Sequence, residues 1–241
     1  IKDVSGQMNR FRRIGVLGGM GPEATVALMQ RIQAGTPARD DADHIPLLVD
    51  MNPQVPSRIQ HLIEKTGPNP GPVIADMAAR LEIAGAEALI LPCNTAHHYE
   101  QYITDRVAIP FLSMPKLTCD TLTGLVRPGT RIGILASPAT NQIGLFQSLL
   151  SDRGMSTLWP RDEVTVLAAI QRIKTAGPTL DDLSVLQDKT NELVDQGASA
   201  ILIGCTEFSL IGTELSAPVP VVDALDVLVK AALAFSGTAT P

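Results

Sequence analysis

Two cysteines, Cys93 and Cys205, are the side chains in this sequence best placed to transfer protons. Each follows a short apolar run and precedes a residue that commonly begins a helix, Asn94 after the first and Thr206 after the second. We therefore expect each sulfur to lie near the positive end of a helix dipole, where the pKa of a thiol falls below its usual value of about 8.5. If the two thiols face each other across a cleft, one can remove a proton from a carbon atom while the other protonates its opposite face. This is the chemistry of racemisation without a cofactor.

The two cysteines end the two copies of an internal repeat. Residues 85–93 (GAEALILPC) align without a gap on residues 197–205 (GASAILIGC), and residues 13–17 (RIGVL) match residues 131–135 (RIGIL) in the same order. Chance similarity between strand–loop patterns is the alternative, but two matched pairs in the same order favour duplication. Cys119 lies in a predicted helix and has no partner in the repeat, so we interpret it as a structural residue. The repeat predicts two similar lobes that face each other.

Short apolar runs alternate with amphipathic ones, which is typical of strands and helices around parallel sheets. The predicted strands are 14–17, 45–49, 88–91, 109–112, 132–135, 200–203 and 219–222. Helical spacing of apolar residues predicts helices around residues 74–81 and 180–186. In parallel α/β sheets ligands bind beyond the carboxyl ends of strands, which is where both cysteines lie. The fold class is therefore α/β, with the active site between two lobes.

The composition excludes several classes of protein. The 241 residues allow one large domain or two small ones, and the net charge of −6 with 3% aromatic residues argues against nucleic acid as a partner. No run of about 20 apolar residues predicts a membrane span. Residues 1–9 contain charges rather than a secretory signal, so we exclude them from the fold and expect Met8 to be the natural start. Three cysteines without CxxC spacing predict no disulfide framework and no metal site, and favour a cytoplasmic location.

Four motifs carry a resemblance to a known family. These are residues 15–25 (GVLGGMGPEAT), 52–58 (NPQVPSR), 92–97 (PCNTAH) and 204–207 (GCTE). From residue 13 to residue 235 the sequence resembles the aspartate racemases of the pyridoxal-phosphate-independent aspartate/glutamate/hydantoin racemase family. The resemblance implies two pseudo-symmetric α/β domains, a homodimer, aspartate as the substrate and no cofactor. We place residues 10–114 and 224–241 in the lobe that carries Cys93, and residues 115–223 in the lobe that carries Cys205.

The same resemblance assigns roles to residues around the two proton-transfer cysteines. Arg58 and Lys174 become cations for the carboxylates of the substrate, and such a role suits a dicarboxylate, which needs more than one cation. Three further residues become donors to the α-carboxylate, whose negative charge grows as the α-proton leaves. These donors are Asn94, Thr95 and Thr206.

Two positions differ from the related glutamate racemases. Met20 stands where those enzymes carry aspartate, and Glu207 stands where they carry histidine. The resemblance places both among the substrate-binding residues. These departures favour aspartate over glutamate as substrate and leave open how the thiols are activated. Glu207 has three interpretations: it binds the substrate ammonium group, it assists a thiol, or it is an acidic residue in the first turn of a helix. For His97 we favour packing or helix capping over proton transfer.

Other functions compete with racemisation. Residues 19–24 (GMGPEA) fit a G-x-G-x-x-A pattern after a strand, and Asp50 ends the next strand, so an NAD-binding oxidoreductase is one alternative. That interpretation leaves the duplicated cysteines unexplained. A metabolite sensor, a racemase of another amino acid, or an isomerase or decarboxylase on the same fold are the remaining alternatives.

Overall fold

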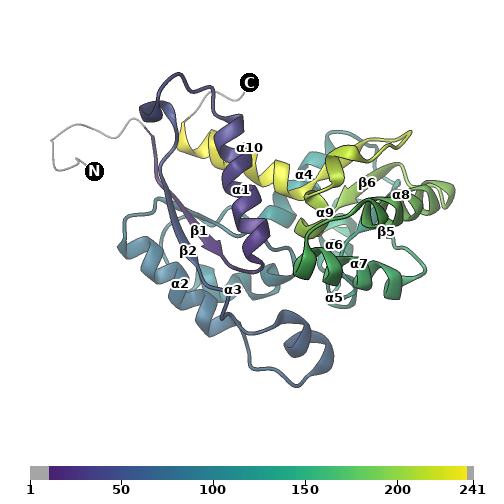
Figure 1. Cartoon of the computed structure of the whole chain (residues 1–241), viewed down its shortest axis with the longest axis horizontal. Coiled ribbons are helices and arrows are strands. Elements are labelled where there is room, and N and C mark those ends of the chain that lie inside the picture. The colour runs from purple at the N-terminus through teal and green to yellow at the C-terminus, as the bar shows by residue number, and fades with distance from the viewer. Residues whose placement is uncertain (1–10, 238–241) are drawn as a thin grey trace.

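The computed structural model describes residues 11–237 and contains, within them, two parallel sheets (Figure 1). The first sheet has the strand order β2-β1-β3, with β1 (Ile14–Gly18), β2 (Leu47–Met51) and β3 (Ala88–Ile90). The second has the order β5-β4-β6-β7, with β4 (Arg131–Leu135), β5 (Ser156–Leu158), β6 (Ala200–Ile203) and β7 (Val221–Asp223). The central strands are buried along their whole length except for Arg131, as strands covered by helices on both faces should be. The predicted α/β class is confirmed.

One predicted strand is wrong and one strand was missed. Residues 109–112 run beside β3 but form only an isolated bridge, between Leu89 and Phe111. Pro110 has no N–H to donate, so this segment cannot extend the ladder of hydrogen bonds. β5 (Ser156–Leu158) escaped prediction because its three residues include two polar ones. β2 begins at Leu47 and β7 at Val221, two residues later than predicted.

The internal repeat is visible in the packing of the two sheets. Gly15 lies in β1 and Gly133 in β4, which are the equivalent strands of the two copies. A β-carbon at Gly15 would lie 2.9 Å from Ala86, and one at Gly133 would lie 3.2 Å from Ala198. Only glycine fits at these two positions, because the segment that carries the neighbouring alanine packs directly against the strand in both copies. The two lobes are therefore built on one plan.

Helices cover the sheets and connect their strands. The longer ones are α1 (Pro22–Gly35), α2 (Gly71–Ile83), α4 (Met114–Thr123), α7 (Glu163–Ala176), α8 (Leu180–Asp195) and α10 (Ala224–Ser236). The shorter ones are η1 (Asp41–Asp43), η2 (Gln60–Glu64), η3 (Thr95–Tyr99), α3 (Glu100–Thr104), α5 (Pro138–Gln142), α6 (Leu145–Ser151), α9 (Thr206–Ser209) and η4 (Gly212–Glu214). The helices expected around residues 74–81 and 180–186 are α2 and α8. Among the described helices none is long and apolar enough to cross a membrane.

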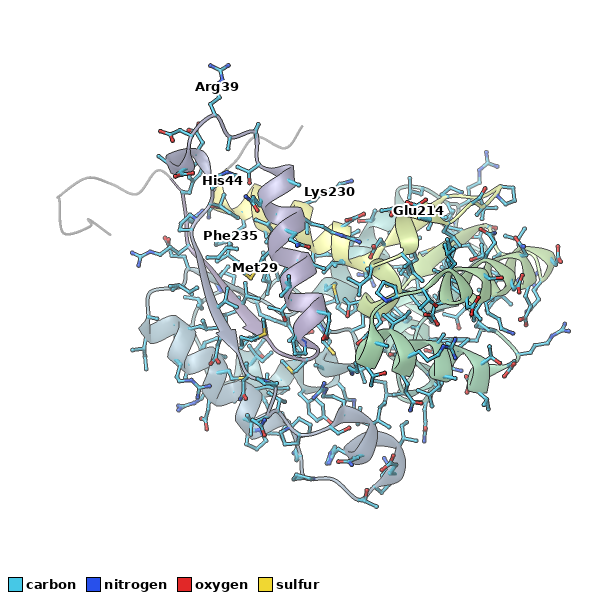
Figure 2. All side chains as sticks on the ribbon, viewed as in Figure 1. Met29, Arg39, His44, Glu214, Lys230 and Phe235 are labelled. Carbon is cyan, nitrogen blue, oxygen red and sulfur yellow. The ribbon has the colours of Figure 1, made fainter. Side chains whose placement is uncertain are left out.

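The chain returns to its first lobe at its end. After β7, α10 leaves the second lobe and lies along α1 and α4 (Figure 1). Phe235 lies near the end of α10 (Figure 2). The Arg12 guanidinium lies over its ring, 4.0 Å from the ring centroid. The Arg12 N–H also donates to the Ser236 carbonyl at 3.0 Å. The assignment of α10 to the first lobe agrees with these contacts, while the exact lobe boundaries stay a prediction, with residues 1–10 and 238–241 outside the described residues.

Candidate active site

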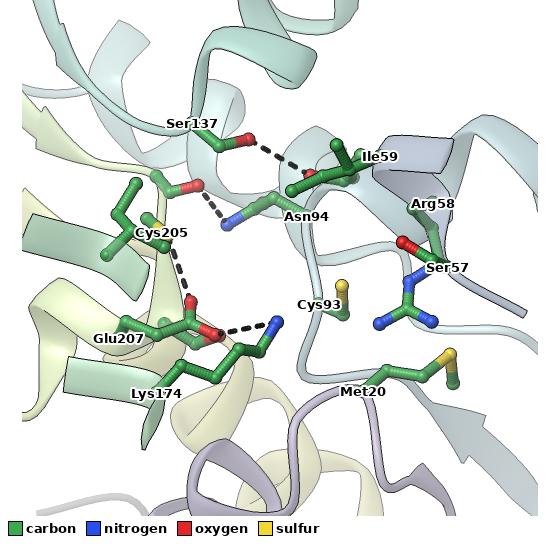
Figure 3. Close-up of a pocket in the computed structure, with 14 residues that line it drawn as sticks. Met20, Ser57, Arg58, Ile59, Cys93, Asn94, Ser137, Lys174, Cys205 and Glu207 are labelled. Atoms are coloured by element: carbon green, nitrogen blue, oxygen red, sulfur yellow. Dashed lines mark hydrogen bonds and ion pairs between the residues drawn. The ribbon is translucent and has the colours of Figure 1, made fainter. Parts of the chain in front are cut away.

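A pocket lies between the two sheets, beyond the carboxyl ends of the equivalent strand pairs β1/β4 and β3/β6 (Figure 3). The cavity is small, with a volume of about 70 Å³. All nine site residues predicted from the sequence line it: Met20, Arg58, Cys93, Asn94, Thr95, Lys174, Cys205, Thr206 and Glu207. Both lobes contribute to this one pocket.

The two cysteines lie on opposite sides of the pocket in unequal surroundings (Figure 3). Cys93 is partly exposed and Cys205 is 8% exposed. The Cys205 thiol donates a hydrogen bond to Glu207 Oε2 at 3.0 Å. Burial raises the pKa of Cys205 well above its usual value, and the negative charge of Glu207 and the nearby Cys93 raise it further. The expectation of a lowered pKa is therefore wrong for Cys205, because burial and a carboxylate outweigh the short helix α9.

The residues after the cysteines do not cap helices as expected. Cys205 itself occupies the N-cap position of α9, and Thr206 is the buried first residue of that helix. The Asn94 side chain turns away from η3, where it makes no capping hydrogen bond. Its Nδ2 instead donates to the carbonyl of Gly204 at 2.8 Å, across the pocket and next to Cys205. Asn94 thus ties the wall that carries Cys93 to the wall that carries Cys205.

Polar groups between the lobes offer further hydrogen bonds to a bound molecule. Asn94 Oδ1 is buried and has no hydrogen-bond partner among the described residues, and a buried acceptor is costly unless a donor satisfies it. Thr95 Oγ1 lies 3.0 Å from Thr140 Oγ1 and 3.4 Å from Ser137 Oγ. This hydroxyl cluster joins the two lobes and reaches the pocket through Thr95 and Ser137.

The two predicted cations differ in their partners. Lys174 Nζ lies 3.6 Å from Glu207 Oε1, so its charge is opposed by a carboxylate. The Arg58 guanidinium donates to the carbonyls of Val55, at 3.2 Å, and Pro56, at 2.8 Å. Among the pocket residues, all of which the structure describes, Arg58 is the cation with no carboxylate partner. It lies on the Cys93 side of the pocket (Figure 3), so it can attract an anionic substrate there.

His97 supports the Cys93 wall and does not line the pocket. Its Nδ1 lies 2.9 Å from the Cys93 carbonyl, and its Nε2 accepts the N–H of Met114 at 3.2 Å. These bonds place the proton on Nδ1, which donates to the carbonyl. Burial lowers the pKa of His97 to about 4, so the ring is neutral near pH 7. The geometry agrees with the packing interpretation of His97.

Five pocket residues escaped sequence reasoning: Ser57, Ile59, Ser137, Ile170 and Gly204. The repeat pairs Ser137 with Gly19, which does not line the pocket, so the repeat gave no signal for Ser137. Ser57 and Gly204 adjoin residues that the motifs did identify. Ile170 lies one turn before Lys174 on α7, and only the three-dimensional packing shows that this face meets the pocket.

Asp50, on which the alternative of NAD binding depends, lies at the end of β2. The Asp50 carboxylate, which a ribose would need, accepts hydrogen bonds from Arg80 at 2.7 and 3.1 Å. That ion pair occupies the group on which the nucleotide interpretation depends. Within residues 11–237 no cluster of three or more histidine, cysteine, aspartate or glutamate side chains is arranged to hold a metal ion.

Comparison with known families found a family model that matches most of the chain. The family model described as Asp/Glu/hydantoin racemase matches residues 17–232, a range that includes both cysteines and both sheets except the start of β1. The chain belongs to the Asp/Glu/hydantoin racemase family. Within this racemase family, a broad-specificity amino-acid racemase from Bacillus subtilis is 25% identical over 225 residues, which cover 90% of this chain and 95% of the relative.

Solved structures of racemases share the fold. An aspartate racemase from Picrophilus torridus superimposes with a TM-score of 0.80 at 26% identity, covering 95% of this chain and 96% of the other. A glutamate racemase from Bacillus anthracis has a TM-score of 0.61 at 16% identity, covering 92% of this chain and 80% of the other. The second similarity shows the fold alone. The chain therefore shares its α/β fold with these racemases.

Proposed function

We propose that this racemase-family protein interconverts the L and D forms of aspartate by two-base proton transfer between Cys93 and Cys205. The observation that carries the proposal is that thiols from equivalent positions of the two lobes line one pocket. We infer different starting roles for the two thiols from their environments. Burial and Glu207 keep the proton on Cys205, so Cys205 begins as the acid and Cys93 as the base.

The proposed reaction has two proton transfers at one carbon. The bond between Cα and its hydrogen breaks, the proton moves to the sulfur of Cys93, and the electron pair is delocalised into the α-carboxylate. The S–H bond of Cys205 then breaks, and its proton bonds to Cα from the opposite face. Donors near Asn94 and Thr95 stabilise the carboxylate as its charge grows. The enzyme is left with the proton on Cys93, which is the form that acts on the other enantiomer.

The charges in the pocket are complementary to aspartate. The pocket contributes two cations, Arg58 and Lys174, and one anion, Glu207. Aspartate contributes two carboxylates and one ammonium group, the reverse pattern. Asn94 Oδ1, a buried acceptor without a partner among the described residues, suits the ammonium group as well. Charge pairing of this kind in a partly buried pocket supports an acidic amino acid as substrate.

One observation favours a second candidate, a racemase of broad specificity. Glu207 already opposes Lys174 at 3.6 Å, which leaves Arg58 to bind a single carboxylate. Met20, Ile59 and Ile170 give part of the pocket an apolar lining that can accept an uncharged side chain. The similarity to a broad-specificity racemase from Bacillus subtilis supports this alternative.

A panel of L-amino acids, assayed without cofactor for loss of optical activity, tests the reaction and its substrate class. We expect aspartate to racemise fastest and to acquire deuterium at Cα in D₂O, because each enantiomer is protonated by a thiol that exchanges with solvent. Similar rates with neutral amino acids would favour the broad-specificity candidate. No loss of optical activity with any amino acid would refute the proposal. A homodimer and a cytoplasmic location remain predictions.

Single substitutions test the two-thiol mechanism. Cys93→Ser and Cys205→Ser should each lower racemisation at least a thousandfold, because serine is a far weaker acid than cysteine. The pocket residues include no third thiol that could replace the lost one. Cys119→Ala is the matched control: Cys119 is fully buried in α4, outside the pocket, and its loss should leave the rate within threefold of the unmodified protein. Full activity in either serine variant would exclude proton transfer by two thiols.

A further inference from the structure

Arg31 of α1 joins three elements close to the helix that carries Cys205. Its Nη1 lies 2.7 Å from Asp223 Oδ2 and 2.7 Å from Asp226 Oδ1. Its Nη2 donates to the carbonyl of Ser209. Asp223 ends β7, Asp226 is in the first turn of α10, and Ser209 is the last residue of α9. One guanidinium group from the first lobe therefore holds the end of α9.

The position of α9 decides the position of Cys205. α9 contains four residues and begins directly after Cys205, and such a short helix cannot maintain itself without outside contacts. Its last residue, Ser209, donates its N–H to the Cys205 carbonyl at 3.2 Å, and its hydroxyl donates to Asp223 Oδ1 at 2.6 Å. On the other flank, Asn94 fixes the Gly204 carbonyl at 2.8 Å. Cys205 is thus held between two anchors that both originate in the first lobe.

The Arg31 contacts are of a kind that only arginine can make. Its side chain is 21% exposed and that of Asp223 is 10% exposed, so the ion pair is largely shielded from water. The planar guanidinium serves two carboxylates and one carbonyl at once, which the point charge of a lysine cannot do. Asp223 also accepts the Leu225 N–H at 2.9 Å, which fixes its carboxylate as the N-cap of α10. The guanidinium therefore binds a carboxylate that is already held in place, and through its bond to the Ser209 carbonyl it holds the end of α9 as well.

We propose that Arg31 is a positioning residue for Cys205, acting through Ser209 and α9. Arg31 does not line the pocket, so its effect on the reaction must pass through this short helix. α1 also begins just after Met20, which does line the pocket, so α1 connects the pocket wall of the first lobe to the cysteine of the second. The effect on turnover rests on the proposed racemisation, whereas the effect on the Cys205 thiol does not.

The test compares Arg31→Met with a matched control, Arg153→Met. Arg153 also binds a carboxylate, Asp120 at 2.6 Å, and a backbone carbonyl, Leu149 at 2.7 Å, and its side chain is 23% exposed. It lies after α6, away from the pocket. We expect Arg31→Met to lower kcat by roughly tenfold to a hundredfold with little change in KM, because small displacements of a reacting group have effects of that size. Arg153→Met should leave kcat within about twofold.

A second readout follows the thiol without any substrate. In a background of Cys93→Ser and Cys119→Ala, iodoacetamide can modify only Cys205, and the rate is measured by mass spectrometry under native conditions. Arg31→Met should change this rate at least fivefold, and Arg153→Met should not. If kcat and the alkylation rate respond equally to the two substitutions, Arg31 has no positioning role. If the unmodified protein racemises nothing, the proposed function fails while the alkylation rates still decide the role of Arg31.

Loss of folding in Arg31→Met would be recognised from its melting temperature, and Arg31→Lys then provides the comparison. Lysine keeps the charge and can pair with one carboxylate, but it cannot also reach the Ser209 carbonyl. We expect Arg31→Lys to fold and still to show a reduced kcat with an altered Cys205 alkylation rate. A lysine variant with unchanged kcat and alkylation would overturn the proposal.

Discussion

The Glu207→Gln substitution tests whether the negative charge of Glu207 keeps the proton on the Cys205 thiol. In the unmodified protein the Cys205 thiol donates to Glu207 Oε2 at 3.0 Å. Glutamine has nearly the same shape and keeps a carbonyl oxygen that can accept this hydrogen bond. It removes the negative charge that disfavours a thiolate at Cys205. Lys174, 3.6 Å from Oε1, would then be unopposed and would favour the thiolate as well. Both changes lower the pKa of Cys205, while burial continues to raise it.

The size of the effect follows from the contact that is weakened. Hydrogen bonds to charged groups contribute about 1–2 kcal/mol more than those to neutral groups, which corresponds to roughly 5- to 30-fold in the thiolate population. With Cys93→Ser and Cys119→Ala in place, Cys205 is the one cysteine of the sequence left to react. Its alkylation by iodoacetamide at a fixed neutral pH should therefore accelerate by about that factor, read as the rate of mass increase.

Two controls make this result specific. Glu207→Asp keeps the charge and should change the alkylation rate less than Glu207→Gln. Glu163→Gln makes the same chemical change at a carboxylate that binds Asn141 at 2.6 Å and does not line the pocket. An alkylation rate that is unchanged or slower in Glu207→Gln would show that Glu207 does not hold the proton on Cys205, and would refute the assignment of Cys205 as the starting acid.

Three further predictions concern other parts of the site. Arg58→Ala should raise the KM for aspartate at least tenfold while the melting temperature falls by only a few degrees, since the substitution removes just two partly buried hydrogen bonds to carbonyls two and three residues away; an unchanged KM would remove Arg58 from substrate binding. Asn94→Ala should destabilise the fold by about 1–3 kcal/mol, lowering the melting temperature by roughly 2–12 °C, because the Gly204 carbonyl loses its buried donor. For His97, the folded pKa of about 4 lies below the unfolded value of about 6.5, so its contribution of about 3 kcal/mol is complete above pH 6.5 and is lost as pH falls toward 4. Urea unfolding of His97→Gln between pH 7 and pH 4 should lack that loss, and an unchanged pH dependence would contradict it.

Much of the site was predictable because the sequence contains an internal repeat, and the repeat shows which residues of the two lobes are equivalent. The matched ends of residues 85–93 and 197–205 place Cys93 and Cys205 at equivalent strand ends, and parallel sheets bring such ends together. The motifs added Arg58, and the resemblance added Lys174. No local pattern, by contrast, indicated Arg31, because its partners Asp223 and Ser209 come from the far end of the chain.

The environment of the thiols was not predictable from sequence. The helix-dipole argument considers only the backbone that follows each cysteine, and it predicts the same shift for both. The structure makes Cys205 buried and places Glu207 two residues later with its carboxylate turned back onto the sulfur. The same carboxylate also pairs with Lys174 of α7, a contact between distant parts of the sequence that periodicity cannot reveal. Likewise, Pro110 ends a predicted strand only because it lies beside β3, where another residue would donate an N–H and proline has none to donate.

The return of α10 to the first lobe has a consequence for synthesis. α10 supplies Leu228, Val229 and Leu233 to a buried cluster that also contains Leu28 and Ile32 of α1. A ribosome makes α1 some 190 residues before α10, although nascent chains generally fold from the N-terminus as domains emerge. The lobe that is translated first therefore has α1 uncovered until α10 leaves the exit tunnel, while the four strands of the second lobe have already been made.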